Sequence, residues 1–391
     1  MNSKKSSAAT ALAVISIAAL VGCSSTPERA AENTDGGTQS APPRIGAFEK
    51  VAENTGMWSG IAVSAQGRKF VSFPKWGDDG TPYTVAEIVD GKTVAYPDAA
   101  HNAAEGDAAT RFISPLAVVI DAQDRLWVLD TGSVEWGPVV PGGPKLVQID
   151  LKSNKVERTI VIGPDAAPSN SYLNDVRFDL NRGPDGTAYI TDSGSSALIV
   201  VDLATGAATR RLAGTESVSA VPEFTPMIND KPMMTRYPGS APGYVNTAAD
   251  GIALSHDGKT LYYSPMTSRH LYSIDAALLA DPAQNDATLA KAVVDQGVKG
   301  VSDGMTADDK GNLYTTDQER NQILRRLPDG RYETQVQDPG FDWIDSVTVA
   351  EDGYLYFTVN QLNALPPFND GKDMRQKPLH LYRTKVDAGP A

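Results

Sequence analysis

Cysteine is nearly absent from this chain of 391 residues, which contains one, and histidine occurs only four times. A single thiol excludes an internal disulfide and a cysteine-ligated metal centre, and no two histidines stand at a metal-binding spacing. Basic residues are outnumbered, with 35 Lys and Arg against 48 Asp and Glu, and the net charge of −13 disfavours nucleic acid as a partner. A hydrophobic content of 41% excludes wholesale disorder.

The N-terminus has the order of an export signal. Two lysines precede an uncharged apolar run over residues 8–21, which is too short for a membrane span, and Gly22 and Cys23 follow it. The segment Leu20-Val-Gly-Cys23 resembles a bacterial lipobox. We therefore predict a lipoprotein signal peptide over residues 1–22 and lipidation of Cys23. The alternative is a plain secretory signal with an incidental cysteine.

The segment that follows the cysteine has no apolar periodicity. Residues 23–44 are rich in Ser, Thr, Ala, Glu, Gly and Pro, a composition that predicts a flexible tether. A lipid on Cys23 would anchor the protein to a membrane surface, because each buried methylene adds about 0.8 kcal/mol. The predicted location is the cell envelope, facing the periplasm or the exterior.

A repeated phrase occupies the rest of the chain. It consists of two alternating apolar segments joined by a polar turn, often Asp-Gly, which supplies the positive φ that tight hairpin turns need. A third strand-like segment follows each hairpin, and a fourth follows most of them. Six such units predict an all-β chain folded as a six-bladed β-propeller over residues 45–391. The hairpins cover residues 59–73, 116–130, 174–191, 250–264, 303–317 and 345–358.

The two ends of the repeat region complement each other. The sixth unit stops after its third strand, and residues 48–52 resemble a fourth strand without a unit of its own. We predict that this N-terminal strand closes the last blade, which would remove an exposed sheet edge.

One position in each unit is a candidate for function. It lies about eight residues before the hairpin turn, so that the six side chains would meet at one mouth of the central channel. Gathered carboxylates repel one another unless a cation or shared protons intervene, and a hard divalent cation, Ca²⁺ by preference, suits such oxygen ligands. The alternative is that these side chains bond to backbone groups and ordered waters. The six positions are Ser59, Leu116, Asn174, Asp250, Asp303 and Asp345.

Four phrases resemble the yellow / major royal jelly protein family in its bacterial, dopachrome-tautomerase-related form. They are Phe70-Val-Ser-Phe-Pro-Lys-Trp76, Arg125-Leu-Trp-Val-Leu-Asp-Thr-Gly132, Ala188-Tyr-Ile-Thr-Asp-Ser-Gly194 and Tyr354-Leu-Tyr-Phe-Thr-Val-Asn360. The blades are also similar to those of gluconolactonase and senescence-marker-protein propellers, with Asp303-Gly-Met305 as the closest phrase. Both resemblances imply a six-bladed propeller.

The yellow resemblance implies a secreted protein that binds a small ligand, an aromatic amine, in the channel mouth. It transfers best to Asp345 and Asn360, with Trp76, Trp343 or Phe357 able to stack on a protonated amine. Packing between blades is the alternative for each of these aromatic side chains.

The gluconolactonase resemblance implies a metal-dependent hydrolase of lactones. Asn174 and Asp303 match that family's ligands in type and Asp250 replaces an Asn, which gives a candidate metal site with Asp303 as ligand and general base. Ser59 stands where that family has a Glu, so the charge would be completed by Asp345 or Asp175.

A third hypothesis is an interaction protein that uses the propeller rim, and whether the protein is an enzyme is left open. Residues 212–244, rich in Pro and Met, fall between two units. They predict either a lid over the channel or a surface crossing.

Overall fold

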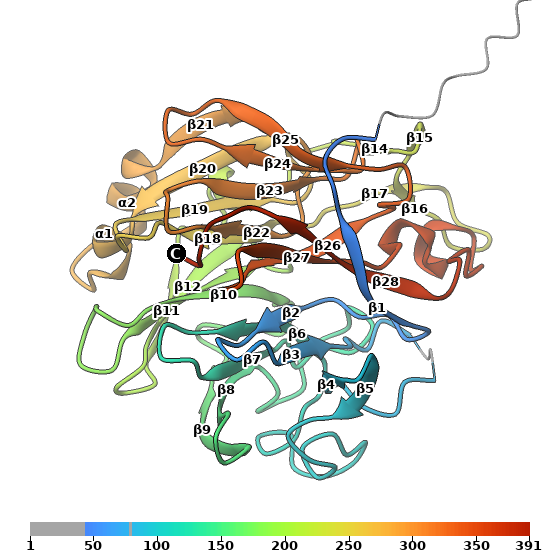
Figure 1. Cartoon of the computed structure of the whole chain (residues 1–391). Coiled ribbons are helices and arrows are strands. Elements are labelled where there is room, and N and C mark those ends of the chain that lie inside the picture. Colours follow the sequence, from blue (N-terminus) through green and yellow to red (C-terminus); the bar gives the residue numbers. More distant parts are fainter. Residues whose placement is uncertain (1–43, 78–79) are drawn as a thin grey trace, which may run out of the picture. The chain divides into compact units, whose positions relative to one another are not determined.

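The computed structural model describes residues 44–77 and 80–391, so the predicted signal peptide, Cys23 and almost all of the predicted tether lie outside the described residues. The described chain forms six four-stranded antiparallel sheets, the blades of a β-propeller, which confirms the predicted fold (Figure 1). No helix among the described residues is long and apolar enough to cross a membrane.

The first three blades follow one another along the chain. Blade 1 contains β2 (Ile61–Val63), β3 (Lys69–Ser72), β4 (Val85–Val89) and β5 (Lys92–Ala95). Blade 2 contains β6 (Pro115–Ile120), β7 (Leu126–Asp130), β8 (Lys145–Asp150) and β9 (Lys155–Val161). Blade 3 contains β10 (Leu173–Asp179), β11 (Thr187–Asp192), β12 (Ala197–Asp202) and β13 (Ala208–Arg211).

The next two blades repeat this order after the insertion. Blade 4 contains β18 (Ala249–Leu254), β19 (Thr260–Pro265), β20 (His270–Asp275) and β21 (Val294–Val298), with helices α1 (Ala276–Ala280) and α2 (Asp286–Ala292) before its last strand. Blade 5 contains β22 (Met305–Ala307), β23 (Leu313–Asp317), β24 (Gln322–Arg326) and β25 (Tyr332–Gln337).

Blade 6 is closed by the N-terminal strand, as predicted. Its sheet order is β1-β28-β27-β26, with β26 (Ile344–Val349), β27 (Tyr354–Val359), β28 (Leu379–Lys385) and β1 (Glu49–Asn54). Figure 1 shows the blue β1 alongside the red end of the chain. The ring of Phe48 packs against Phe341 and Tyr382, with ring centroids 4.7 and 5.5 Å apart. Both ends of the described chain therefore share one sheet.

Short side chains join neighbouring blades near the channel. The hydroxyl of Thr191 donates to the carbonyl oxygen of Asp250 over 2.6 Å, and Thr358 donates to that of Ser59 over 2.6 Å. At Gly251 and Gly304 an added Cβ would lie closer than 3.0 Å to the carbonyl oxygen of the next blade. Glycine follows the candidate position in these blades because the backbones approach so closely.

The insertion after blade 3 packs tightly on the propeller. It contains the short 3₁₀ helix η1 (Glu216–Val218) and two small hairpins, β14 (Met227–Ile228) with β15 (Lys231–Pro232), and β16 (Met234–Thr235) with β17 (Gly243–Tyr244). Ile228, Met233 and Val245 belong to one apolar core with residues of blades 1 and 6.

The same insertion is tied to the loop between β27 and β28, which carries the 3₁₀ helices η2 (Leu362–Ala364) and η3 (Pro366–Phe368). The backbone N–H of Arg236 donates to the carbonyl of Pro367 over 2.6 Å, and Asn229 donates to Asp342 over 2.9 Å. The insertion thus crosses from blade 3 to blade 6, and residues 245–247, which connect it to β18, line the central cavity described next.

Candidate functional site

The structure brings the six candidate positions together at the channel. A cavity of about 500 Å³ is lined by the side chains at five of them, and Ser59 lines a smaller space of about 20 Å³ together with four of these. Loops of blades 1, 2 and 3, residues 245–247 after the insertion and the loop after β27 complete the cavity wall. Each of these residues lies in the first strand of its blade or, for Ser59 and Asp303, just before it, and together they converge at the channel as the sequence predicted.

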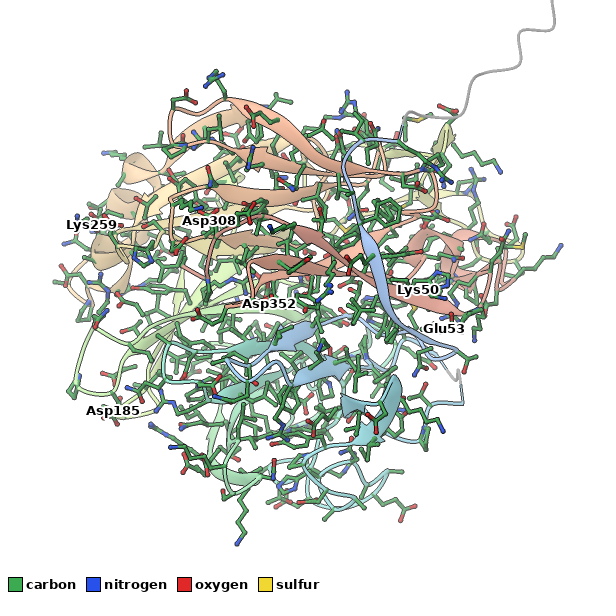
Figure 2. The ribbon with its side chains drawn as sticks, viewed as in Figure 1. Lys50, Glu53, Asp185, Lys259, Asp308 and Asp352 are labelled. Atoms are coloured by element: carbon green, nitrogen blue, oxygen red, sulfur yellow. The ribbon has the colours of Figure 1, made fainter. Side chains whose placement is uncertain are left out.

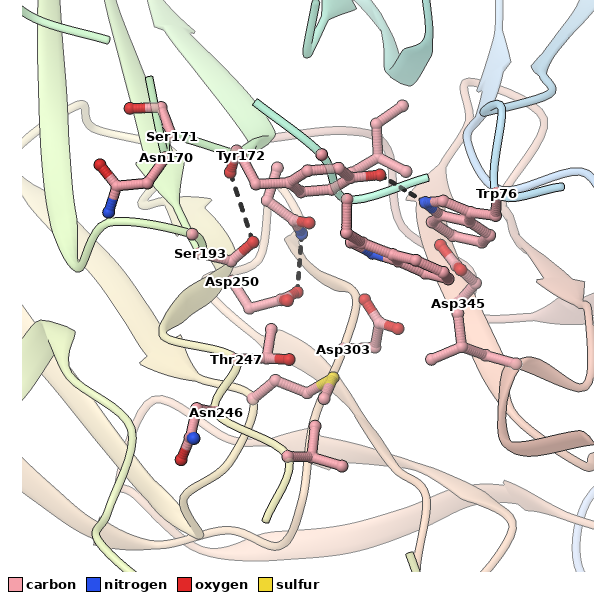
Figure 3. A pocket seen from close by; sticks show the side chains of 18 of the residues that line it. Trp76, Asn170, Ser171, Tyr172, Ser193, Asn246, Thr247, Asp250, Asp303 and Asp345 are labelled. Carbon is pink, nitrogen blue, oxygen red and sulfur yellow. Dashed lines mark hydrogen bonds between the residues drawn. The ribbon is translucent and has the colours of Figure 1, made fainter. Parts of the chain in front are cut away.

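One wall of the cavity is aromatic. The indole Nε1 of Trp76 donates to the hydroxyl of Tyr172 (Figure 3). Trp136 stacks on Trp76, with ring centroids 5.5 Å apart and an interplanar angle of 9°. Burial and the nearby carboxylates raise the pKa of Tyr172 far above its usual range, so its phenol stays protonated. The apolar side chains of Met266 and Phe368 also line the cavity.

Opposite the aromatic wall, Asp250 and Asp303 form a carboxyl pair. The amide of Asn174 donates to Asp250 Oδ1 over 2.7 Å, and the indole of Trp343 donates to Asp303 Oδ2 over 2.8 Å. The two carboxyl groups influence each other's ionisation: the charge of Asp250 raises the pKa of Asp303, so the pair holds a proton to a higher pH than an ordinary carboxyl group. Burial raises the pKa of both groups, and the charge of Asp345 raises it further.

Asp345 is the third carboxyl group of the cavity (Figure 3). It accepts hydrogen bonds from the hydroxyl of Ser59 over 2.6 Å and from the amide of Asn360 over 2.5 Å. Burial raises the pKa of Asp345 to about 6, although these two donors favour the ionised form. Asp345 therefore gains its negative charge at a lower pH than the carboxyl pair.

A buried cation lies behind the acidic groups. Lys299 is 4% exposed, its Nζ donates to the carbonyl of Gly300 over 3.0 Å, and burial lowers its pKa to about 7 against the opposing charges of Asp317 and Asp250. It does not line the cavity. Among the described residues no Lys, Arg or His side chain does, so the cavity surface carries acidic groups without basic ones.

Three of the side chains that the sequence suggested for a ligand lie outside the cavity. Trp343 and Asn360 are fully buried and contact Asp303 and Asp345, so they support the acidic groups from behind. Phe357 packs in the apolar core between blades 5 and 6, because its position on β27 turns the ring toward the aromatic cluster there. Of the suggested aromatic side chains, Trp76 lines the cavity.

The predicted metal ligands share one part of the cavity. Asn174, Asp250 and Asp303 come from consecutive blades and offer an amide and two carboxyl groups. They fit a hard cation in donor type, provided that the Asn174 amide turns its oxygen inward and the carboxyl pair loses its proton. Within residues 44–77 and 80–391, no group of three or more His, Cys, Asp or Glu side chains is arranged to bind a metal ion.

Sequence reasoning missed several residues of the site. Tyr172 stands two residues before Asn174, Trp136 follows the Leu-Asp-Thr-Gly phrase by four residues, and Lys299 precedes Asp303 by four. Each lies in a loop that enters the innermost strand or leaves the second strand of a blade. Their nearness in sequence to a candidate position or a family phrase could have pointed to them. The repeat does not predict the loop conformation that directs each side chain toward the site.

The described chain is a six-bladed β-propeller with a central cavity, and solved structures share this fold. A gluconolactonase from Xanthomonas campestris is 15% identical, with a TM-score of 0.52 over 89% of this chain and 96% of that one. A calcium-binding regucalcin from Agrobacterium tumefaciens is 12% identical, with a TM-score of 0.51 over 89% and 97%. At these identities the likeness concerns the fold alone.

The sequence comparison gives the family. The family model named Major royal jelly protein matches residues 113–387, and the chain belongs to this family. Major royal jelly protein 1 of Apis mellifera is 30% identical over 213 residues, which are 51% of this chain and 46% of that protein. Protein yellow of Drosophila melanogaster is 27% identical over 244 residues, 56% of this chain and 41% of that protein. The chain thus matches about half the length of these relatives.

Proposed function

We propose that this protein binds a small aromatic amine, as its ammonium cation, in the central cavity. The observation that supports the proposal most strongly is a cavity of about 500 Å³ with three carboxyl groups, an aromatic wall and no basic side chain on its described surface. A cation would relieve the mutual repulsion of Asp250, Asp303 and Asp345, which are held close together in a desolvated space. Family membership is consistent with this function but does not specify the ligand.

The geometry assigns parts of the ligand to parts of the cavity. The ammonium group would make charge-assisted hydrogen bonds to Asp345, whose carboxylate is already oriented by Ser59 and Asn360. The aromatic ring would lie along Trp76 and Trp136. The hydroxyl of Tyr172 accepts from Trp76, which leaves its own proton available for an acceptor on the ligand.

Titration calorimetry with tryptamine, and with tryptophol as its neutral counterpart, tests the proposal. Tryptophol has a hydroxyl group in place of the amine, so a site that selects the cation binds tryptamine at least tenfold more tightly. Asp345→Asn is expected to reduce the affinity for tryptamine by about 10- to 100-fold, the usual range for a hydrogen bond to a charged group. Equal binding of the two compounds, or binding of neither, would refute the proposal.

A pair of aromatic substitutions tests the stacking wall separately. Trp136 is 40% exposed and Tyr237 is 54% exposed, so neither substitution removes a buried core side chain. Trp136→Ala is expected to weaken tryptamine binding by about 2- to 10-fold, the usual range for an aromatic contact. Tyr237→Ala serves as the control, because Tyr237 does not line the cavity, and it should leave the affinity unchanged.

We further propose that the protein is exported and anchored to a membrane through Cys23. The support is the charged, apolar and small-residue order of the first 23 residues. In cell fractions the protein is expected with the membranes, and Cys23→Ser should move it to the soluble fraction or leave it unprocessed. A Cys23→Ser variant that stays with the membranes after its signal peptide has been removed would contradict lipid anchoring.

The second candidate is a metal-dependent lactone hydrolase, favoured by the placement of Asn174, Asp250 and Asp303 on consecutive blades. A divalent cation held there, Ca²⁺ by preference, would polarise a lactone carbonyl. Asp303 would orient the attacking water and accept its proton, which requires the carboxyl pair to be fully ionised.

Elemental analysis of the protein starting at Ser24, purified without chelator, separates the two candidates. About one Ca²⁺ or transition metal ion per chain, lost from the Asp250→Ala/Asp303→Ala double variant, would favour the hydrolase, and Asp303→Asn should then abolish lactone hydrolysis. Equal metal content in the two proteins would remove the support for this candidate.

A further inference from the structure

A second hollow of about 280 Å³ lies between blades 2 and 3, and it shares no lining residue with the central cavity. Two guanidinium groups, of Arg125 and Arg158, and two carboxamides, of Gln123 and Gln148, face it. The one carboxylate that lines it belongs to Asp185. Hydrogen-bond donors therefore outnumber acceptors on this surface.

The two arginines use only part of their donor capacity. Arg125 directs its Nε and one terminal nitrogen to the buried carboxylate of Asp121, both over 2.7 Å, so one edge of its guanidinium is fixed and oriented. Arg158 is paired with Asp185 at 3.7 Å, a separation too long for a hydrogen bond. Arg158 carries a charge that this loose contact compensates only in part.

Asp185 lies in a long hairpin turn of blade 3. Its first hairpin has a longer turn than those of the other blades, and Leu180, Pro184 and Asp185 of this turn line the hollow. The turn is held in place by the ion pair of Arg182 with Asp179 at 3.1 Å and by the bond from Arg182 to the carbonyl of Gly258. The side chain of Asp185 is 58% exposed and lies at the edge of the molecule (Figure 2).

We propose that this hollow binds a compact oxyanion, a phosphate or carboxylate group, between Arg125 and Arg158. Asp121 already neutralises Arg125, so the charge that remains for the ligand is that of Arg158. A guanidinium group can donate to two oxygens of one anion. Gln148, which is 6% exposed, also lines the hollow, and one N–H of its amide is already donated to Glu157 over 3.1 Å. Asp185 competes with the ligand, because its carboxylate occupies the outer side of the same guanidinium.

Phosphorus NMR of inorganic phosphate, titrated with the full folded chain at low ionic strength, tests the proposal. Arg158→Gln removes the uncompensated charge and should weaken binding at least tenfold, as is usual when a charge-assisted hydrogen bond is lost. Asp185→Asn removes the competing carboxylate and should tighten binding by about threefold or more. A variant that tightens binding cannot be explained by damage to the fold.

Arg331→Gln is the matched control, since Arg331 pairs with Asp329 over 2.8 Å in blade 5 and should leave phosphate binding unchanged. Acetate added in competition distinguishes the two oxyanions: displacement of phosphate indicates a site for carboxylates as well, and its failure indicates selectivity for phosphate. The proposal is overturned if phosphate does not bind, if Arg158→Gln binds it as the wild type does, or if Asp185→Asn binds it more weakly.

Discussion

The buried carboxyl groups should make the protein less stable as the pH rises, and Asp345 allows the effect to be calculated. Burial raises its pKa from an ordinary 3.8 to about 6 in the folded protein. The folded state therefore holds the proton more tightly than the unfolded state. The associated stability is fully present below about pH 4 and is lost as the pH rises through about 6.

The size of the effect follows from the same two values. The pKa values of Asp345 in the unfolded and folded states differ by about 2. This difference changes the free energy of unfolding by about 3 kcal/mol between low and high pH, because each pKa unit contributes about 1.36 kcal/mol. For a folded region of this size, about 3 kcal/mol lowers Tm by about 4 °C. The carboxyl pair, whose pKa values are also raised, changes stability in the same direction.

Thermal unfolding in metal-free buffers between about pH 4 and pH 7, followed by circular dichroism, measures this effect. Asp345→Asn removes the titrating group and keeps the shape, since the new amide can still accept from Asn360 and donate to Ser59. This variant should lose about 3 kcal/mol of the pH dependence. Asp165→Asn, at an exposed position, makes the same change in charge and serves as the control. The same pH dependence in Asp345→Asn and wild type would refute the calculation.

Three further predictions concern the framework of the site. Gly304→Ala should lower the free energy of unfolding in urea by about 1–3 kcal/mol, because its Cβ would strike the backbone of the next blade. Gly163→Ala, whose Cβ would meet no atom within 4 Å, should change it by less than about 0.5 kcal/mol. Equal effects of the two substitutions would contradict the close approach. Phe48→Ala should destabilise the closure of blade 6 by about 1–3 kcal/mol and accelerate amide hydrogen exchange in β28 more than in the other strands. Equal acceleration in all strands would argue against the closing strand. Asn360→Ala should raise the pKa of Asp345, read as a shift of the stability transition to higher pH, since it removes a donor to the carboxylate; an unchanged transition would exclude this role.

The repeat explains why the blades could be predicted from the sequence. In four hairpin turns the glycine adopts the positive φ that the pattern implied, with values between 69° and 80°. These residues are Gly67, Gly258, Gly311 and Gly353. The alternation of apolar residues is local, and six copies of it leave little freedom in how the sheets form. The closing strand was also predictable, because the sixth unit lacked a fourth strand and an unpaired one preceded the first.

The same periodicity located the six candidate positions, but it could not say which neighbouring side chains turn toward the cavity. Trp343 and Phe357 are aromatic and close in sequence to Asp345, yet they pack behind the site and in the core between blades 5 and 6. Trp136 and Tyr172 reach the cavity from loops whose paths depend on contacts with other blades. A loop has no period from which the direction of a side chain can be read.

The sequence by itself determined the six-bladed ring, its closure and the meeting of Asn174 with three aspartates, since each follows from a repeated local pattern. Only the tertiary structure decided that the charge of Asp250 raises the pKa of Asp303, and that Trp343 and Asn360 donate hydrogen bonds to acidic groups without lining the cavity. It also decided that residues 245–247, which follow the insertion, reach the cavity wall. The physical reason is that hydrogen-bond partners, burial and the pKa values that follow from them depend on distances between segments far apart in the chain.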